Sequence, residues 1–392
     1  MNLFESQIDV SLTSQVSFLL ALSLYWSVVV ELGKRVFERW LVRRDFWERA
    51  KVPQMQMMAN FGYKQPIDDR SVVSAFSFVC VLAVHHLFCG SMMLPVAVFG
   101  WSGSGVFIRN LFILGALNNL AFDIYDFIFT TLRAWGGALR EAFGLSPVPV
   151  IPWIVVHVLH PSLSLLLCAP MCAFYVELRQ FHVAACSLIL AGGVSFLIGQ
   201  FKFTLDVSQP NSLLLYKSLI LFQLGLLLYT RVYIWFPVYF ETVEFFKNDD
   251  GPYAHEFYKA GAVLGGTLSV FNVLTVLDCL NAAAKWLPKT LPKTRAEKRE
   301  MALEVVRQGS LDFGGASPSL LYIAEETPRM IVKSLVKSRS LLHFSDNDHL
   351  MSSLDSPTPT SPAQDATTRS LPGTGRKRVE ARPLGQLRRR IT

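Results

Sequence analysis

The chain has 392 residues, of which 51% are hydrophobic and only 17% are charged. Soluble domains carry about 25% charged residues, so this composition excludes an ordinary soluble protein. The 37 Lys and Arg residues outnumber the 30 Asp and Glu residues. Most of that excess lies in one connecting segment and in the C-terminal tail, which is typical of membrane topology and not of a nucleic-acid-binding surface.

Seven apolar stretches occupy the first three quarters of the chain. Each approaches or exceeds the roughly 20 residues that a helix needs to cross a bilayer. The predicted spans are 11–31, 72–99, 106–132, 149–176, 183–205, 212–238 and 257–284. The first has no small-residue cleavage site after it and is interpreted as a retained anchor. The predicted fold class is therefore all-α, a polytopic transmembrane helical bundle with a C-terminal tail.

The charges of the connecting segments predict the orientation. Nine basic residues separate the first two spans: Lys34, Arg35, Arg39, Arg43, Arg44, Arg49, Lys51, Lys64 and Arg70. The connection after the sixth span is acidic instead. Because positive charge stays on the cytoplasmic side, we expect a lumenal N-terminus and a cytosolic C-terminus.

Three parts are predicted along the chain. Residues 1–70 hold the first span and a basic connector, in which 34–49 is expected to form an amphipathic helix on the membrane surface. Residues 71–287 form the main transmembrane bundle. Residues 288–392 are rich in Ser, Thr, Pro and charge and are expected to be disordered. This basic tail offers a contact for anionic lipid or a protein partner.

The six cysteines all lie in apolar stretches, where a free thiol behaves as a small hydrophobic group. No Cys/His cluster has the spacing of a zinc site. We therefore predict neither a disulfide framework nor a metal site.

Ionisable side chains inside spans are costly and usually face the bundle interior, so they are functional candidates. Ten occur here: His85, His86, Asp123, Asp126, His157, His160, Asp206, Lys217, Arg231 and Asp278. His85 and His86 are adjacent, so one is expected to face a cavity and the other a neighbouring helix. Arg231, deep in the sixth span and near its lumenal end, is expected to reach lipid headgroups or to pair with a carboxylate.

Two pairs of these residues are predicted to meet. Asp123 and Asp126 lie about 14 and 9 Å from the cytosolic end of the third span, and His157 and His160 about 12 and 16 Å into the fourth. Each pair has i,i+3 spacing and so shows one helix face. Together with Asp206 they predict a polar cavity open to the cytosolic side. A structural polar network, a ligand-binding cavity and a catalytic site all remain consistent with this pattern.

The order of motifs resembles the TLC (TRAM/LAG/CLN) domain, a family of multi-pass endomembrane proteins, from about residue 71 to 287. The pieces that carry the resemblance are Leu120–Asp126, His157–His160, Leu205–Asn211, Tyr229–Pro237 and Phe271–Asn272. The resemblance implies six TLC-like spans in an endoplasmic reticulum or related membrane. It also implies binding, sensing or regulation of sphingolipid or phospholipid, with Asp123, Asp126, His157, His160 and Arg231 contacting the lipid.

Two alternatives accompany that expectation. Ceramide synthases of this family join an acyl-CoA to a sphingoid base, which would make His157, His160 and Asp206 catalytic and acyl-CoA a co-substrate. The chain departs from their motifs, because Val158 and Leu159 separate the histidines and Leu205 replaces a histidine before Asp206. The other alternative is a cargo receptor that acts through its tail. No other cofactor and no nucleic-acid partner is expected, and a homo-oligomer is left open.

Overall fold

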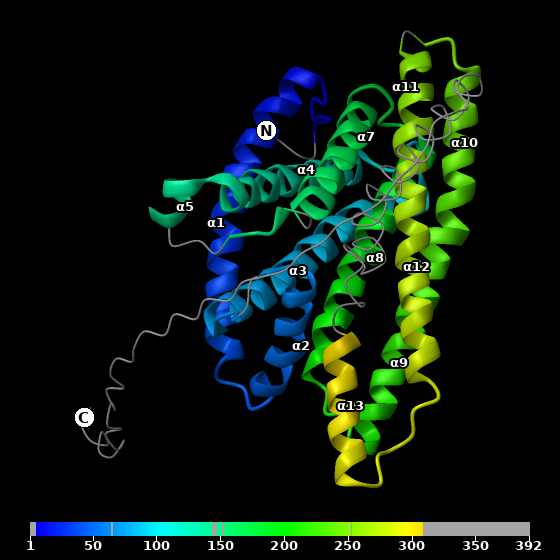
Figure 1. Ribbon diagram of the computed structural model, residues 1–392. Coiled ribbons are helices and arrows are strands. Elements are labelled where there is room, and N and C mark those ends of the chain that lie inside the picture. Colours follow the sequence, from blue (N-terminus) through cyan, green and yellow to red (C-terminus); the bar gives the residue numbers. More distant parts are fainter. Residues whose placement is uncertain (1–4, 64–65, 143–146, 151–152, 252, 309–392) are drawn as a thin grey trace, which may run out of the picture. The chain divides into compact units, whose positions relative to one another are not determined.

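The computed structural model describes residues 5–63, 66–142, 147–150, 153–251 and 253–308, all within one unit that runs from Met1 to Ser334 (Figure 1). Within these ranges the secondary structure is helical. The elements are α1 (Leu12–Leu41), α2 (Trp47–Asn60), α3 (Asp69–Phe99), α4 (Val106–Trp135), α5 (Gly137–Ala142), the π-helical η1 (Trp153–Leu159), α7 (His160–Phe174), α8 (Arg179–Thr204), α9 (Pro210–Leu227), π-helical η2 (Leu228–Ile234), α10 (Trp235–Asn248), α11 (Ala254–Ala260), π-helical η3 (Gly261–Gly265), α12 (Gly266–Trp286) and α13 (Arg295–Gln308).

Seven helices of the described chain are long and apolar enough to cross a membrane, and each coincides with a predicted span. The ends differ most in the sixth, where α9, η2 and α10 form one continuous helix from Pro210 to Asn248. At 1.5 Å per residue this helix is about 58 Å long, well beyond a hydrocarbon core of about 30 Å. It runs beside the helix formed by α11, η3 and α12 (Figure 1).

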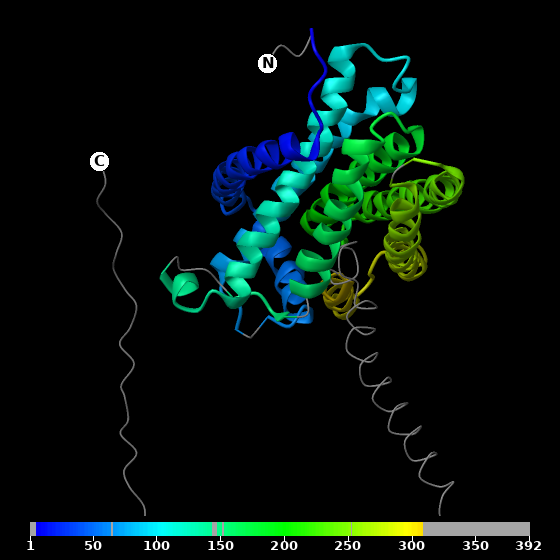
Figure 2. The same ribbon diagram turned by 90° about the horizontal axis from the view of Figure 1, so that it is seen from above.

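The third transmembrane helix, α4, is the centre of the bundle. In the most apolar stretch of α4, 72% of the residues are buried, against 17% in the corresponding stretch of α1. Helix α4 packs on α1, α3 and α7, and Figure 2 shows it passing between α1 and the green helices of the middle of the chain. The residues of α4 that carry the predicted carboxylates are therefore surrounded by protein.

Small residues allow the central helices to approach closely. A Cβ atom at Gly90 of α3 would lie 2.9 Å from the Leu190 Cβ of α8, and one at Gly193 of α8 would lie 2.8 Å from the Leu87 backbone nitrogen of α3. Gly115 of α4 approaches the backbone of α3 in the same way. Such contacts are typical of membrane helices, which associate through close packing. They fix the register of α3 against α8, and with it the direction of the histidines on α3.

Residues 34–49 do not form one helix, so the predicted bounds of the amphipathic helix are wrong. Helix α1 continues to Leu41, a turn follows, and α2 begins at Trp47. Neither proline nor glycine interrupts residues 34–46, so nothing in the backbone stops α1 at the end of its apolar stretch. Trp47 packs on Phe76 of α3, with ring centroids 5.7 Å apart, and so contacts protein.

The predicted boundary of the disordered tail, residue 288, lies too early in the chain. Residues 295–308 form α13, and Met301 is buried in a cluster with Tyr216 and Trp286. A capping box starts this helix, because the Glu297 amide donates to Thr294 Oγ1 at 3.1 Å and the Thr294 amide donates to Glu297 Oε2 at 3.3 Å. That Thr-x-x-Glu signal is present in the sequence. The rest of the predicted tail, from residue 309, lies outside the described residues.

Candidate functional site

A cavity of about 470 Å³ lies among α3, α4, α7, α8, the long sixth helix and α12. This volume falls within the range of ligand pockets, about 300 to 1,000 Å³. Most of its lining is apolar. Its polar lining includes His86, Asn119, Asp123, Asp126, His157, His160, Ser164, Gln180, Arg231 and Glu256. The cavity therefore combines an apolar body with a few convergent polar groups, which is the usual composition of a small-molecule site.

The strongest polar contact in the cavity joins α4 to η1. His157 Nδ1 donates to Asp126 Oδ2 at 2.6 Å, and both side chains are largely buried, with 16% and 13% of their surfaces exposed. A distance this short is typical of a hydrogen bond to a charged group. Because Nδ1 is held by the carboxylate, Nε2 is the ring nitrogen left to accept a proton or a hydrogen bond.

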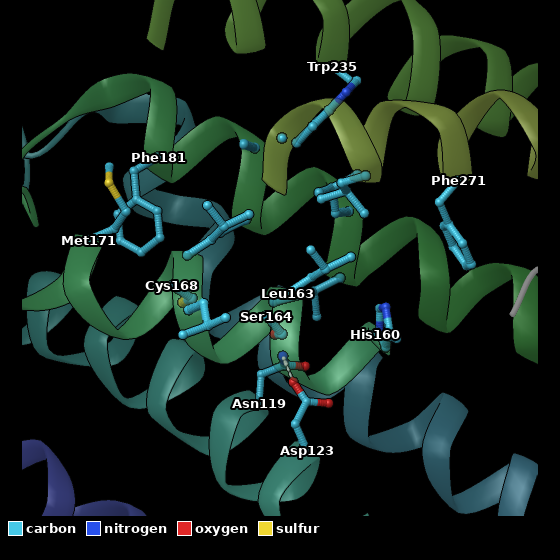
Figure 3. Close-up of a pocket in the computed structure, with 18 of the residues that line it drawn as sticks. Asn119, Asp123, His160, Leu163, Ser164, Cys168, Met171, Phe181, Trp235 and Phe271 are labelled. Atoms are coloured by element: carbon cyan, nitrogen blue, oxygen red, sulfur yellow. Dashed lines mark hydrogen bonds between the residues drawn. The ribbon is translucent and has the colours of Figure 1, made fainter. Parts of the chain in front are cut away.

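The second carboxylate, Asp123, lies one turn earlier on α4. Asn119 Nδ2 donates to Asp123 Oδ2 at 3.3 Å, and Ser164 of α7 lies beside the same carboxyl group (Figure 3). Asp123 is only 6% exposed. Two carboxylates on one face of α4 are thus held by different partners, one by an imidazole and one by an amide and a hydroxyl.

The histidines divide between the cavity and the core. His160 faces the cavity and stacks on Phe271 of α12, with ring centroids 6.0 Å apart (Figure 3). His86 of α3 also lines the cavity, and its Nδ1 donates to the Leu82 carbonyl at 3.0 Å. His85 instead packs between Trp26 and Phe122. As their adjacency predicts, His85 and His86 face different neighbours.

Each of the three π-helical turns contributes to the cavity lining. The turn η1 carries His157, η2 carries Arg231, and η3 carries Gly261 and Gly265. A π turn widens the helix by one residue and is frequent at functional sites. At Gly265 a Cβ atom would lie 2.5 Å from the Tyr239 ring, so η3 can approach α10 only because the residue is glycine.

Arg231 lies near the middle of the long sixth helix and not close to its end as predicted. Its Nη1 donates to Asn272 Oδ1 of α12 at 2.8 Å, and its Nη2 donates to the Leu188 carbonyl of α8 at 3.4 Å. The predicted carboxylate partner is therefore replaced by two neutral acceptors among the described residues.

Besides His85, three predicted polar residues do not line the cavity: Asp206, Lys217 and Asp278. Asp206 closes the turn between α8 and α9 by accepting hydrogen bonds from the hydroxyl and amide of Ser208, at 2.7 and 3.1 Å. Partial burial acts to raise the pKa of Asp206, but these hydrogen bonds outweigh it and lower that pKa below its ordinary value. Lys217 Nζ donates to the Leu287 carbonyl at 2.7 Å, and Asp278 is buried within α12. Asp206 is thus a turn residue in this structure.

Asn119 and Ser164 are not among the residues predicted for the site, although their spacing from Asp123 and His160 in the sequence indicates them. Asn119 is four residues before Asp123, and Ser164 is four residues after His160, so each shares a helix face with a predicted site residue. The lining also reaches Gln180 and Glu256, at helix ends that the charge pattern assigns to the lumenal side. The cavity is therefore longer than the predicted cytosol-facing one.

Comparisons with protein-family models, with characterised proteins and with solved structures find no match to this chain. The resemblance to the TLC domain rests on the sequence motifs alone. Four of the five motifs contribute a cavity-lining residue, and the fifth, Leu205–Asn211, forms the turn that contains Asp206. In the described chain no group of three or more His, Cys, Asp or Glu side chains is arranged to hold a metal ion.

Proposed function

We propose that this chain is a TLC-like protein of the endoplasmic reticulum or a related membrane that binds a membrane lipid in the cavity and so senses or regulates lipid composition. The observation that carries the proposal is the convergence of Asp123, Asp126, His157 and His160 on one apolar cavity. A cavity with an apolar body and a small polar cluster is complementary to an amphiphile, whose chain displaces water and whose head forms hydrogen bonds.

The polar cluster is suited to recognising a head group. The carboxyl groups of Asp123 and Asp126 accept hydrogen bonds, His160 offers a ring nitrogen, and Ser164 can both donate and accept. A sphingoid base offers an amine and hydroxyls, which are donors that these carboxylates can bind. Burial of Asp123 and Asp126 strengthens the interactions of their carboxylates, because little water competes for the same groups.

Photo-crosslinkable sphingoid and acyl-chain probes test this proposal on the purified full chain. We expect the probes to label peptides of α4 and α7, and we expect the double variant Asp123→Ala/His157→Ala to reduce that labelling at least about fivefold. Loss of two head-group hydrogen bonds, each contributing at least about 0.5 kcal/mol, accounts for a change of at least this size.

The matched control removes the same two residue types outside the cavity. Asp250 and His255 are exposed and do not line the cavity, so Asp250→Ala/His255→Ala should label like the unmodified chain. Labelling that is equal in both double variants would exclude the cavity as the lipid site.

A ceramide-synthase-like acyltransferase is the second candidate, and the Asp126–His157 contact favours it. A carboxylate that holds Nδ1 leaves Nε2 of His157 to take a proton from an amine or a hydroxyl as it attacks an acyl-CoA. Asp206 lies away from this pair, so the acid–base pair in this candidate is Asp126 with His157, and His160 lies one turn further along.

This candidate makes a direct prediction of activity. Membranes of a ceramide-synthase-deficient host that express the chain should form ceramide from acyl-CoA and a sphingoid base, and His157→Ala should lower that activity at least about a hundredfold. An unchanged host background in the presence of expressed, folded protein would exclude the acyltransferase and leave lipid binding untouched.

A further inference from the structure

The guanidinium of Arg231 is positioned far from both ends of its helix. Arg231 follows Pro210 by about 32 Å and precedes Asn248 by about 26 Å at 1.5 Å per residue. An arginine side chain that close to the middle of a long apolar helix does not extend to either end. Its charge must therefore be stabilised inside the bundle.

The protein groups around Arg231 supply no negative charge. Its two hydrogen bonds go to the Asn272 amide oxygen and the Leu188 carbonyl, and it forms no ion pair with any described residue. The Nε donor of Arg231 is buried without an acceptor, and so is the Nδ2 donor of Asn272. A guanidinium carries five N–H donors, so more donors than acceptors meet at this point.

Two imidazoles share this part of the cavity with Arg231. His86 and His160 lie within electrostatic range of Arg231 and line the same cavity. Of the acidic lining residues, Asp123 accepts a hydrogen bond from Asn119 and Asp126 is bound by His157. Glu256 lies about 24 Å along the last long helix from Asn272. This part of the cavity therefore combines a fixed positive charge, two imidazoles and surplus hydrogen-bond donors.

From this arrangement we infer that the amphiphile bound by the cavity carries an oxyanion, a carboxylate or a phosphate monoester, which pairs with Arg231. Charge-assisted hydrogen bonds from a guanidinium to a carboxylate or a phosphate are among the strongest polar contacts in proteins. Burying an unpaired charge is costly, so a ligand that brings the missing negative charge is favoured over a neutral one. The inference rests on the proposed function and specifies its ligand.

The rest of the cavity selects an amphiphile over a soluble anion. Apolar side chains, among them Met171, Phe181 and Trp235, extend from the polar cluster along α7, α8 and α10 (Figure 3). A hydrocarbon chain gains about 0.8 kcal/mol for each methylene that it buries against such a surface. Inorganic phosphate would gain nothing from this part of the cavity.

Equilibrium binding to the purified full chain in neutral detergent tests the inference with four probes: hexadecanoate, palmitoyl lysophosphatidate, hexadecanol and inorganic phosphate. We expect the two anionic amphiphiles to bind at least about tenfold more tightly than hexadecanol. Inorganic phosphate should not compete with them at millimolar concentration.

Two variants abolish the net positive charge at this point of the cavity in different ways. Arg231→Gln deletes it, and Asn272→Asp places a carboxylate on the side chain that already lies 2.8 Å from Arg231 Nη1. In both variants the ratio of the affinity for the anionic amphiphiles to that for hexadecanol should fall to about one, through a loss of affinity for the anions. Because Asn272→Asp adds an ion pair within the bundle, it tests the inference even if Arg231→Gln does not fold.

Arg109→Gln is the matched control. Arg109 also lies in an apolar helix, and its Nε donates to the Trp101 carbonyl at 2.9 Å, but it does not line the cavity. The preference for anions should persist in Arg109→Gln.

The outcomes separate this inference from the proposed function. Equal affinity for hexadecanoate and hexadecanol, or an anion preference that survives both charge-removing variants, would refute the anionic ligand and leave lipid binding intact. If inorganic phosphate displaces the anionic amphiphiles at millimolar concentration, the cavity is a site for soluble anions. That result would refute an amphiphile as the ligand. If none of the four probes binds, the inference fails, and labelling by the sphingoid photo-probe decides the lipid-binding function separately.

Discussion

Replacing Asp126 by alanine is expected to lower the free energy of unfolding by about 1.5 to 3 kcal/mol. This is the range for losing a hydrogen bond to a charged group and leaving the buried His157 donor without an acceptor. An ordinary neutral hydrogen bond between membrane helices averages about 0.6 kcal/mol. The 2.6 Å contact and the burial of both side chains place this pair in the stronger class.

A double-mutant cycle measures the interaction itself. Reversible unfolding in mixed micelles of the unmodified chain, Asp126→Ala, His157→Ala and the double variant should yield a coupling energy of about 1.5 kcal/mol or more. The exposed pair Gln180 and Glu241, 3.3 Å apart, serves as a control and should couple by less than about 0.5 kcal/mol. A coupling near about 0.6 kcal/mol for Asp126 and His157 would contradict a charged partner.

Adding a single methyl group at Gly193 is expected to disrupt the packing of α3 against α8. The Cβ atom of Gly193→Ala would lie 2.8 Å from the Leu87 backbone nitrogen and 3.0 Å from the His86 Cβ atom. Backbone cannot move aside as a flexible side chain can, so α3 and α8 must separate. We expect a loss of about 1 to 3 kcal/mol in the free energy of unfolding and weaker labelling by the lipid probes, because His86 lines the cavity.

Gly225→Ala provides the matched control for Gly193→Ala. Gly225 lies in α9, and a Cβ atom there meets nothing within 4 Å. The substitution should be neutral or should stabilise the helix by about 0.5 to 1 kcal/mol, since alanine favours helix more than glycine. Similar unfolding energies for the two alanine variants would show that close packing at Gly193 does not hold α3 against α8.

The polar cluster was accessible to sequence reasoning because it depends on helix geometry. The i,i+3 spacing of Asp123 with Asp126, and of His157 with His160, places each pair on one face whatever the tertiary fold. Consecutive antiparallel spans then bring the two pairs to the same depth. Asn119 and Ser164 obey the same spacing rule and could have been included.

The role of Asp206 could not be predicted in the same way. It follows the end of α8, where a residue can either face the bundle or close a turn, and motif resemblance favoured the first. Ser208, two residues later, offers a hydroxyl and an amide to the carboxylate, and this local contact holds Asp206 in the turn. Local side-chain hydrogen bonds of this kind compete with long-range ones and are not visible as periodicity.

The sequence by itself determined the seven apolar helices, because the length needed to cross a bilayer and the cost of unpaired backbone groups in lipid leave no other structure for such stretches. It also determined which faces of the third and fourth spans carry the carboxylates and the imidazoles. Only the tertiary structure decided that the π turns open toward one cavity and that Arg231 meets Asn272 and Leu188 instead of a carboxylate. Those features depend on contacts between helices far apart in sequence, which close packing at residues such as Gly193 and Gly265 sets and which composition and periodicity do not encode.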